Sequence, residues 1–133
     1  MNPVSLLTMV FALAFINMLM GTVSLKTFLS GTHSINSPID LQNFAALVRR
    51  HMIQALLQLV FLLAGMVLGI YILASGQAGL LLILALNGSI LVAANLGKKL
   101  EKQARQLPVS DPQLQESYQA ICTSWINKPF PDF

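Results

Sequence analysis

The sequence predicts an all-α integral membrane protein with three transmembrane helices, at about residues 3–29, 52–74 and 78–97. Of its 133 residues, 55% are hydrophobic and only 10% are charged, whereas a soluble domain has about 25% charged residues. The runs 52–74 and 78–97 contain no Asp, Glu, Lys or Arg. At about 1.5 Å per residue they reach about 34 Å and about 30 Å, which matches the roughly 30 Å hydrocarbon core of a bilayer.

The first predicted helix has a competing interpretation as a cleaved signal peptide. Such a peptide has a basic segment before its apolar run and small residues at its cleavage site. Here the first basic residue is Lys26, which follows the apolar run, and the run is longer than a signal peptide requires. We therefore expect a retained helix that ends at Gly31, with this glycine as a left-handed cap.

The second helix is expected to begin before the membrane, at about residue 38. Ser37 is a favourable N-cap, Pro38 suits the first helical position, and Asp40 favours the first turn. The following turns place five apolar residues on one face: Leu41, Phe44, Ala45, Val48 and Met52. The chain either continues into the membrane as one rod or kinks near His51 and lies along the headgroups. We favour the rod, because neither Pro nor Gly interrupts this stretch.

Small residues at four-residue spacing are predicted to pack the second and third membrane helices together. Gly65 and Gly69 form a small-xxx-small pair, which lets another backbone approach closely. The third helix carries a longer stripe of the same kind: Ala85, Ser89, Ala93 and Gly97. A hairpin that turns near Gly76 places the two glycines level with about residues 83–88, so we expect the two small faces to meet.

The C-terminal part is expected to form a second unit. Residues 1–107 make up the membrane domain, whose third helix extends to about residue 106, and residues 108–133 form a cytoplasmic amphipathic tail. A short helix from Pro112 to about residue 127 places apolar side chains on one face, and two phenylalanines follow it. The candidate partner-docking residues are Leu114, Tyr118, Ile121, Trp125, Phe130 and Phe133. The polar face carries no Lys or Arg, so we expect docking on protein, either residues 38–50 or another subunit, rather than on headgroups.

Basic residues set the expected orientation. Six of them are predicted to contact lipid headgroups: Arg49, Arg50, Lys98, Lys99, Lys102 and Arg105. Glu101 is expected to form only a weak surface pair with Arg105. The turn at residues 75–77 carries no charge. The positive-inside rule therefore places residues 31–50 and the C-terminal part in the cytoplasm or its equivalent.

Few residues of the chain are of types that could act in catalysis or bind a metal or cofactor. His51 could ligate a haem or a chlorophyll magnesium, but a bis-histidine haem needs a second histidine at similar depth, and the only other one, His33, lies in a predicted loop. We therefore assign no catalytic or metal-binding residue and identify no cofactor.

Five amide residues lie within the apolar runs: Asn17, Gln54, Gln58, Asn87 and Asn95. We expect them to form hydrogen bonds between helices rather than to line a path for solutes. The single cysteine, Cys122, is expected to be a structural or free thiol.

These features predict a non-catalytic accessory, assembly or stabilising subunit of a larger membrane complex. Its expected partners are membrane lipids and other integral membrane subunits. No basic pattern interleaved with aromatic residues indicates nucleic-acid binding. The expected location is multi-pass, in a bacterial inner membrane or an organellar, thylakoid-type membrane, with an energy-converting complex as a plausible host. Two alternatives stay open: a small transporter or channel formed by oligomerisation, and a cofactor- or lipid-binding membrane protein that uses His51.

The orientation can be tested with topology reporters. We expect a reporter fused at Phe133 to be active in the cytoplasm and one fused at Gln77 to be active on the opposite side. The reason is that basic residues lie at the membrane ends on the same side as the C-terminus and are absent from the turn at residues 75–77. The activities of matched pairs of alkaline phosphatase and green fluorescent protein fusions would measure this. A cytoplasmic signal at Gln77 would contradict the orientation.

Overall fold

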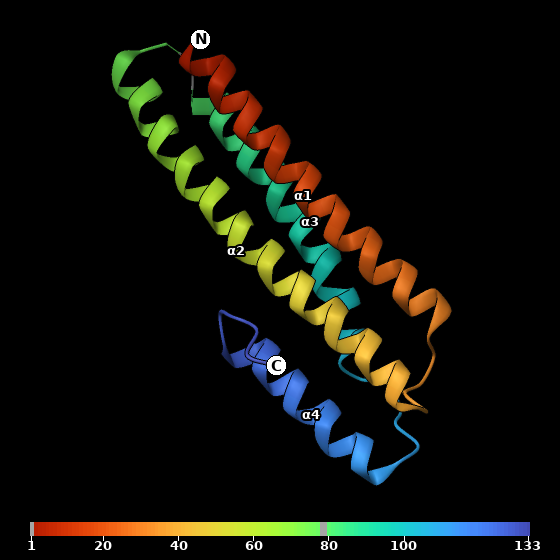
Figure 1. The fold of residues 1–133 in the computed structure, drawn as a ribbon. Helices are drawn as coiled ribbons and strands as arrows, with labels where there is room; N and C mark the ends of the chain where they lie inside the picture. Colours follow the sequence, from red (N-terminus) through yellow and green to blue (C-terminus); the bar gives the residue numbers. More distant parts are fainter. Residues whose placement is uncertain (1, 78–79) are drawn as a thin grey trace.

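The computed structural model describes residues 2–77 and 80–133, and within these ranges the chain is helical (Figure 1). Four helices follow one another: α1 (Pro3–Gly31), α2 (Pro38–Ser75), α3 (Leu80–Ala104) and α4 (Pro112–Asn127). The all-α prediction is confirmed for this part of the chain. Two helices, α1 and α2, are long and apolar enough to cross a membrane. The predicted start of the third membrane helix, at Ala78, lies outside the described residues.

Local capping determines where the helices begin. The side chain of Asn2 accepts a hydrogen bond from the Val4 amide at 3.0 Å, and that of Ser37 accepts one from the Asp40 amide at 3.2 Å. From this start α2 continues for 38 residues without interruption. It ends at Gly76, whose φ of 67° is left-handed. The predicted left-handed cap at Gly31 is wrong, because α1 ends on Thr32 in an extended conformation.

Helix α1 makes the central contacts among the three long helices. It packs along α2 and along α3, whereas α2 and α3 make little direct contact among the described residues. A buried cluster joins the three helices at the end distant from α4: Leu7, Phe11, Ala14, Ile72 and Ile90. Apolar packing of this end therefore depends on the side chains of α1.

The predicted meeting of the two small faces is wrong for Gly65. A Cβ atom on Gly65 would lie 3.4 Å from Phe11 Cε2, so this glycine makes room for an aromatic ring of α1. A Cβ atom on Gly69 would lie 3.9 Å from the Ile83 side chain of α3, but Ala85 and Ser89 are exposed. The stripe of small residues is therefore not the surface on which α2 packs.

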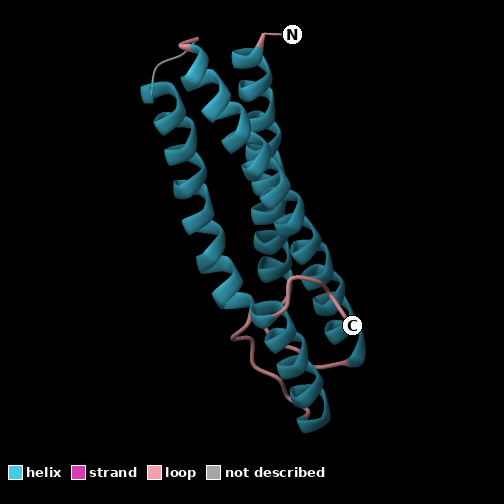
Figure 2. Cartoon of the chain, turned by 90° about the vertical axis from the view of Figure 1, so that its left-hand side faces the viewer, coloured by secondary structure: helices cyan, strands magenta, loops and turns pink. Residues whose placement is uncertain are grey.

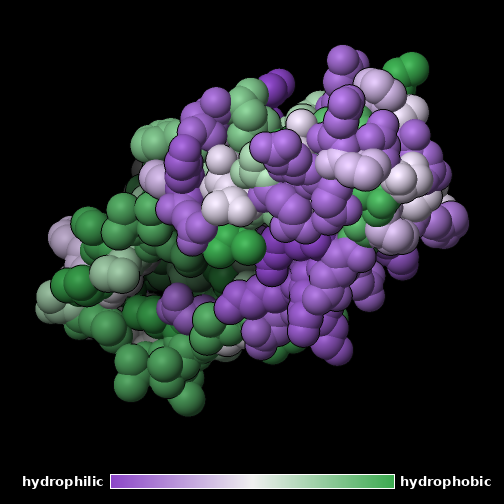
Figure 3. Space-filling model, turned by 90° about the horizontal axis from the view of Figure 1, so that it is seen from below, coloured by the Kyte–Doolittle hydropathy of each residue, from purple (hydrophilic) through white to green (hydrophobic). Residues whose placement is uncertain are grey.

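The lower end of the molecule is a compact polar-faced cap, residues 31–50 and 98–133, in which α4 lies against the start of α2 (Figures 1 and 2). Two loops meet there, because the Ile35 amide donates to Pro108 O at 2.9 Å and the Ser110 amide donates to Ile35 O at 3.2 Å. The rings of Phe44 and Tyr118 lie 4.8 Å apart at the centre of its core. Viewed from below, the cap is mostly hydrophilic, whereas hydrophobic side chains cover one side of the molecule (Figure 3).

The tail therefore docks within its own chain. Tyr118 and Ile121 are buried against α2, and Trp125 is packed against the same core. Of the two protein surfaces expected for the tail, the structure has the one on residues 38–50. These three residues therefore pack within their own chain and not on a separate subunit. Leu114 and Phe133 are half-buried, and Phe130 remains exposed.

Tyr118 closes the end of α3. Its hydroxyl donates to the Ala104 carbonyl at 2.5 Å and accepts from the Leu107 amide at 3.1 Å. The carbonyl belongs to the last turn of α3, where no further helical amide is available to it. Burial raises the pKa of the Tyr118 phenol above its ordinary range, so the hydroxyl keeps the proton that it donates.

We expect Tyr118→Phe to destabilise the cap by about 1–3 kcal/mol, because the Ala104 carbonyl and the Leu107 amide lose their partner. Denaturant unfolding followed by the fluorescence of Trp125 would measure the loss. Tyr71→Phe is the matched control, since Tyr71 is exposed on α2, and it should change the midpoint little. Equal midpoints for the two variants would contradict the role of this hydroxyl.

Candidate functional site

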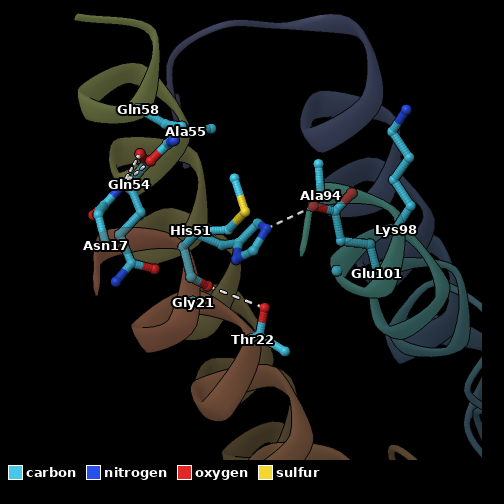
Figure 4. Close-up of a pocket in the computed structure, with 12 residues that line it drawn as sticks. Asn17, Gly21, Thr22, His51, Gln54, Ala55, Gln58, Ala94, Lys98 and Glu101 are labelled. Atoms are coloured by element: carbon cyan, nitrogen blue, oxygen red, sulfur yellow. Dashed lines mark hydrogen bonds and ion pairs between the residues drawn. The ribbon is translucent and has the colours of Figure 1, made fainter. Parts of the chain in front are cut away.

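A cavity of about 200 Å³ with polar side chains from each helix lies between α1, α2 and α3, on the side of the bundle that adjoins the cap (Figure 4). Each helix contributes four of its lining residues. They are Asn17, Met18, Gly21 and Thr22 of α1, His51, Gln54, Ala55 and Gln58 of α2, and Ala94, Gly97, Lys98 and Glu101 of α3. Polar side chains that are distant in the sequence therefore meet at one place.

A hydrogen bond between His51 and Glu101 connects α2 to α3. His51 Nε2 lies 2.7 Å from Glu101 Oε1, and the two side chains are 14% and 27% exposed. A carboxylate only accepts, so Nε2 carries the hydrogen and the lone pair of the neutral ring is on Nδ1. This Nδ1 is buried and has no partner within the described residues. The other carboxylate oxygen of Glu101 lies 3.9 Å from Arg105.

The expected pair of Glu101 with Arg105 is present, and His51 is a second partner that was not predicted. The sequence held a signal for the second partner, because His51 and Glu101 each lie 25 residues from Gly76. Equal rise on both sides of a turn places two such residues at the same depth. A histidine and a carboxylate at that depth can form a bond even where the helices are otherwise separated.

Amide groups connect α1 to α2. Asn17 Nδ2 donates to Gln54 O and to Gln58 Oε1, each at 3.0 Å. The main-chain oxygen can only accept, which fixes the amide nitrogen of Asn17 on this side. Gln58 must then turn its oxygen toward Asn17, and its Nε2 is buried without a partner in the described part of the chain. Inter-helix hydrogen bonding, as predicted for these amides, is present here. Asn87 instead donates to Ile83 O of its own helix, and Asn95 is exposed.

Gly21 keeps the cavity open. A Cβ atom at this position would lie 3.2 Å from Gln54 Oε1 and 3.6 Å from His51 Nδ1. Gln54 Oε1 is a third buried atom without a partner among the described residues. The missing side chain of Gly21 therefore leaves space beside two unpaired polar atoms.

The His51–Glu101 pair also borders a second cavity, of about 260 Å³, on the side of the tail. Trp125 lines this cavity together with Lys128 and Pro129. The rings of His51 and Trp125 have centroids 5.5 Å apart and are inclined at 74°. One pair of side chains thus separates a cavity in the membrane part from a cavity in the cap.

The residues predicted to contact headgroups divide into two groups. Arg49 donates to the main-chain oxygen of Phe133 at 3.1 Å and lies 5.7 Å from the centroid of its ring. Arg105 lies 5.5 Å from the Trp125 centroid. These two arginines therefore hold the tail. The other four are exposed: Arg50, Lys98, Lys99 and Lys102.

The remaining candidates stand apart from the cavity. His33 is exposed in the loop between α1 and α2 and is not among the lining residues. Among the described residues no group of three His, Cys, Asp or Glu side chains could hold a metal ion. Cys122 is buried in the cap, and burial raises the pKa of its thiol, which disfavours the reactive thiolate.

Comparison with protein-family models, with curated proteins and with solved structures gives no match for this chain. Its function is therefore inferred from the geometry of the molecule itself.

We expect Glu101→Gln to destabilise the bundle by about 1 kcal/mol, because the amide oxygen can still accept from His51 but the hydrogen bond between these two helices, which touch little elsewhere, loses its charged acceptor. The same change after His51→Asn should cost much less, since the partner is already absent. Unfolding in detergent mixtures would measure the four variants of this cycle. Glu116→Gln, at an exposed carboxylate of α4, is the control and should have little effect. Additive losses in the cycle would show that the two side chains do not interact.

Proposed function

We propose that this chain spans a membrane three times, with α3 as the third span. The apolar part of α3 runs to Gly97 and lies beside α1, which is itself long and apolar enough to span. The charged cap gathers at one end of the three helices (Figure 1). Every Lys and Arg belongs to that end: Lys26, Arg49, Arg50, Lys98, Lys99, Lys102, Arg105 and Lys128. By the positive-inside rule the cap is cytoplasmic.

Within that membrane, we propose a non-catalytic accessory or stabilising role in a larger complex. The observation that carries this is the outward face of α3. Asn95 is exposed there and makes no side-chain hydrogen bond within the described residues, and Ala85 and Ser89 are exposed on the same helix. Small residues and an amide at membrane depth are typical of surfaces between helices. They favour a second integral membrane subunit against α3.

The cap supports the same proposal. Its aromatic residues are used to hold α4 on α2, and Tyr118 and Cys122 are buried. A raised pKa keeps both of these groups in their neutral forms, which do not act as nucleophiles. The cap then serves to fix the cytoplasmic ends of the three helices, and the exposed Ile126 and Phe130 are its remaining apolar contacts for a partner.

The proposal is tested by solubilising membranes in a mild detergent and identifying what is purified with the tagged chain. We expect a heteromeric complex with at least one other membrane subunit. We expect Ala85→Leu to reduce recovery of that partner at least fivefold, because added bulk on the small face separates the helices.

Val67→Leu is the matched control, since Val67 is highly exposed on α2 and should tolerate one more methylene in lipid. A monomer, or a closed homo-oligomer of this chain alone, would contradict the accessory role. The homo-oligomer would support a transporter or channel instead, and a coloured product would support a cofactor-binding protein.

A further inference from the structure

The cavity between α1, α2 and α3 has three unsatisfied polar atoms along the wall that α2 forms. His51 Nδ1, Gln54 Oε1 and Gln58 Nε2 are all buried without a partner among the described residues. Buried polar groups are nearly always hydrogen-bonded, so three such atoms beside one cavity call for a bound group that pairs with them. Figure 4 shows these three side chains around the same space.

The chemistry of these atoms defines the occupant. His51 Nδ1 is an acceptor in the neutral ring, and Gln58 Nε2 is a donor. Gln54 offers an amide that can present either its oxygen or its nitrogen by turning. A bound group must therefore both donate and accept hydrogen bonds, as a hydroxyl does.

Charge on the occupant is disfavoured. The Lys98 ammonium points away from His51 in Figure 4, so it does not offer a counter-charge to an anion near Nδ1. The Glu101 carboxylate is already bonded to His51 and lies beside Arg105, so it is not free to neutralise a cation. An uncharged group avoids the free-energy cost of burying an anion or a cation without a counter-charge.

The other lining residues and the volume of the cavity limit which part of a bound molecule can enter. Met18, Ala55, Ala94 and Gly97 are apolar or small. A cavity of about 200 Å³ holds the volume of roughly six or seven water molecules. That is enough for a head group but not for a whole lipid. The remainder of the molecule would then lie outside, among the exposed apolar side chains of α2 and α3.

We propose that this cavity binds the uncharged, hydroxyl-bearing head group of a lipid-soluble molecule. His51 accepts a hydrogen bond from its hydroxyl, and Gln58 donates one to a hydroxyl oxygen. The same chemistry is offered by an aryl diol and by a glycerol head. This site is independent of the accessory role, because residues of this chain line the cavity without a contribution from another subunit.

The test uses the full-length chain in nanodiscs of phosphatidylcholine, a lipid without a free hydroxyl in its glycerol part. Trp125 is the only tryptophan and lies beside His51, so its fluorescence reports on the site. Decylhydroquinone, kept reduced under nitrogen, is the probe. We expect saturable quenching in the parent and at least tenfold weaker binding in Gly21→Ala, whose methyl group occupies the space beside Nδ1 and Oε1.

Gly88→Ala is the matched control, because nothing lies within 4 Å of the added methyl group, and it should bind as the parent does. A second variant, Gln54→Met, keeps the volume and leaves no partner unpaired, since the Gln54 side chain makes no hydrogen bond within the described residues. It should fold and bind at least threefold more weakly. Circular dichroism of each variant verifies the fold.

Monodecanoylglycerol distinguishes the two sources of the head group. Displacement of the probe assigns the site to hydroxylated lipid heads in general. Failure to displace it assigns the site to aryl diols. Both outcomes require saturable binding of the probe and so support the proposal. Quenching that rises linearly with the probe in the parent would show partitioning only and would overturn it. Unchanged binding in both folded variants, Gly21→Ala and Gln54→Met, would overturn it as well.

Discussion

The hydrogen bond between His51 and Glu101 is the interaction on which the arrangement of the three long helices depends. Helices α2 and α3 touch little elsewhere in the described part of the chain, and α1 lies along both. Without this bond, the ends of α2 and α3 nearest the cap would be joined mainly through α1, since the other contacts of α2 with α3 lie at the far end, around Ile72 and Ile83. The bond lies at the boundary of the apolar runs, where both side chains are largely shielded from solvent. Low exposure to water strengthens a hydrogen bond. Arg105 extends the contact from Glu101 to Trp125 of the tail.

Two different driving forces meet at that boundary. The cap contains a buried core around Phe44 and Tyr118, as a soluble domain does, and the transfer of these side chains from water stabilises it. In the proposed arrangement of three spans, the helices would gain nothing comparable from burying leucine, because lipid is equally apolar, so packing and hydrogen bonds would have to hold them. The amides of Asn17 and Gln58 supply such bonds between α1 and α2. A polar cavity can therefore persist beside an apolar bundle.

What the sequence predicted well is local. Ser37 is the N-cap of α2 in the structure, and α4 begins at Pro112 as expected, because each start depends on a few neighbouring residues. What it predicted wrongly is the choice of partner. Gly65 makes room for a neighbour, but spacing alone does not say whether that neighbour is Phe11 or α3. The site was missed for a related reason: Glu101 has a partner in its own helix, which concealed the one across the bundle.

The position of His51 gives one ring two structural tasks. Its Nε2 holds α3 through Glu101, and its Nδ1 faces the cavity beside Gly21. The two nitrogens share one π system, so a hydrogen bond at Nδ1 changes the polarity of the bond at Nε2. Trp125 lies against the same ring from the cap side. A group bound at Nδ1 would therefore contact the same ring that bonds to α3 and touches the tail. The cavity and the cap are linked through this one side chain.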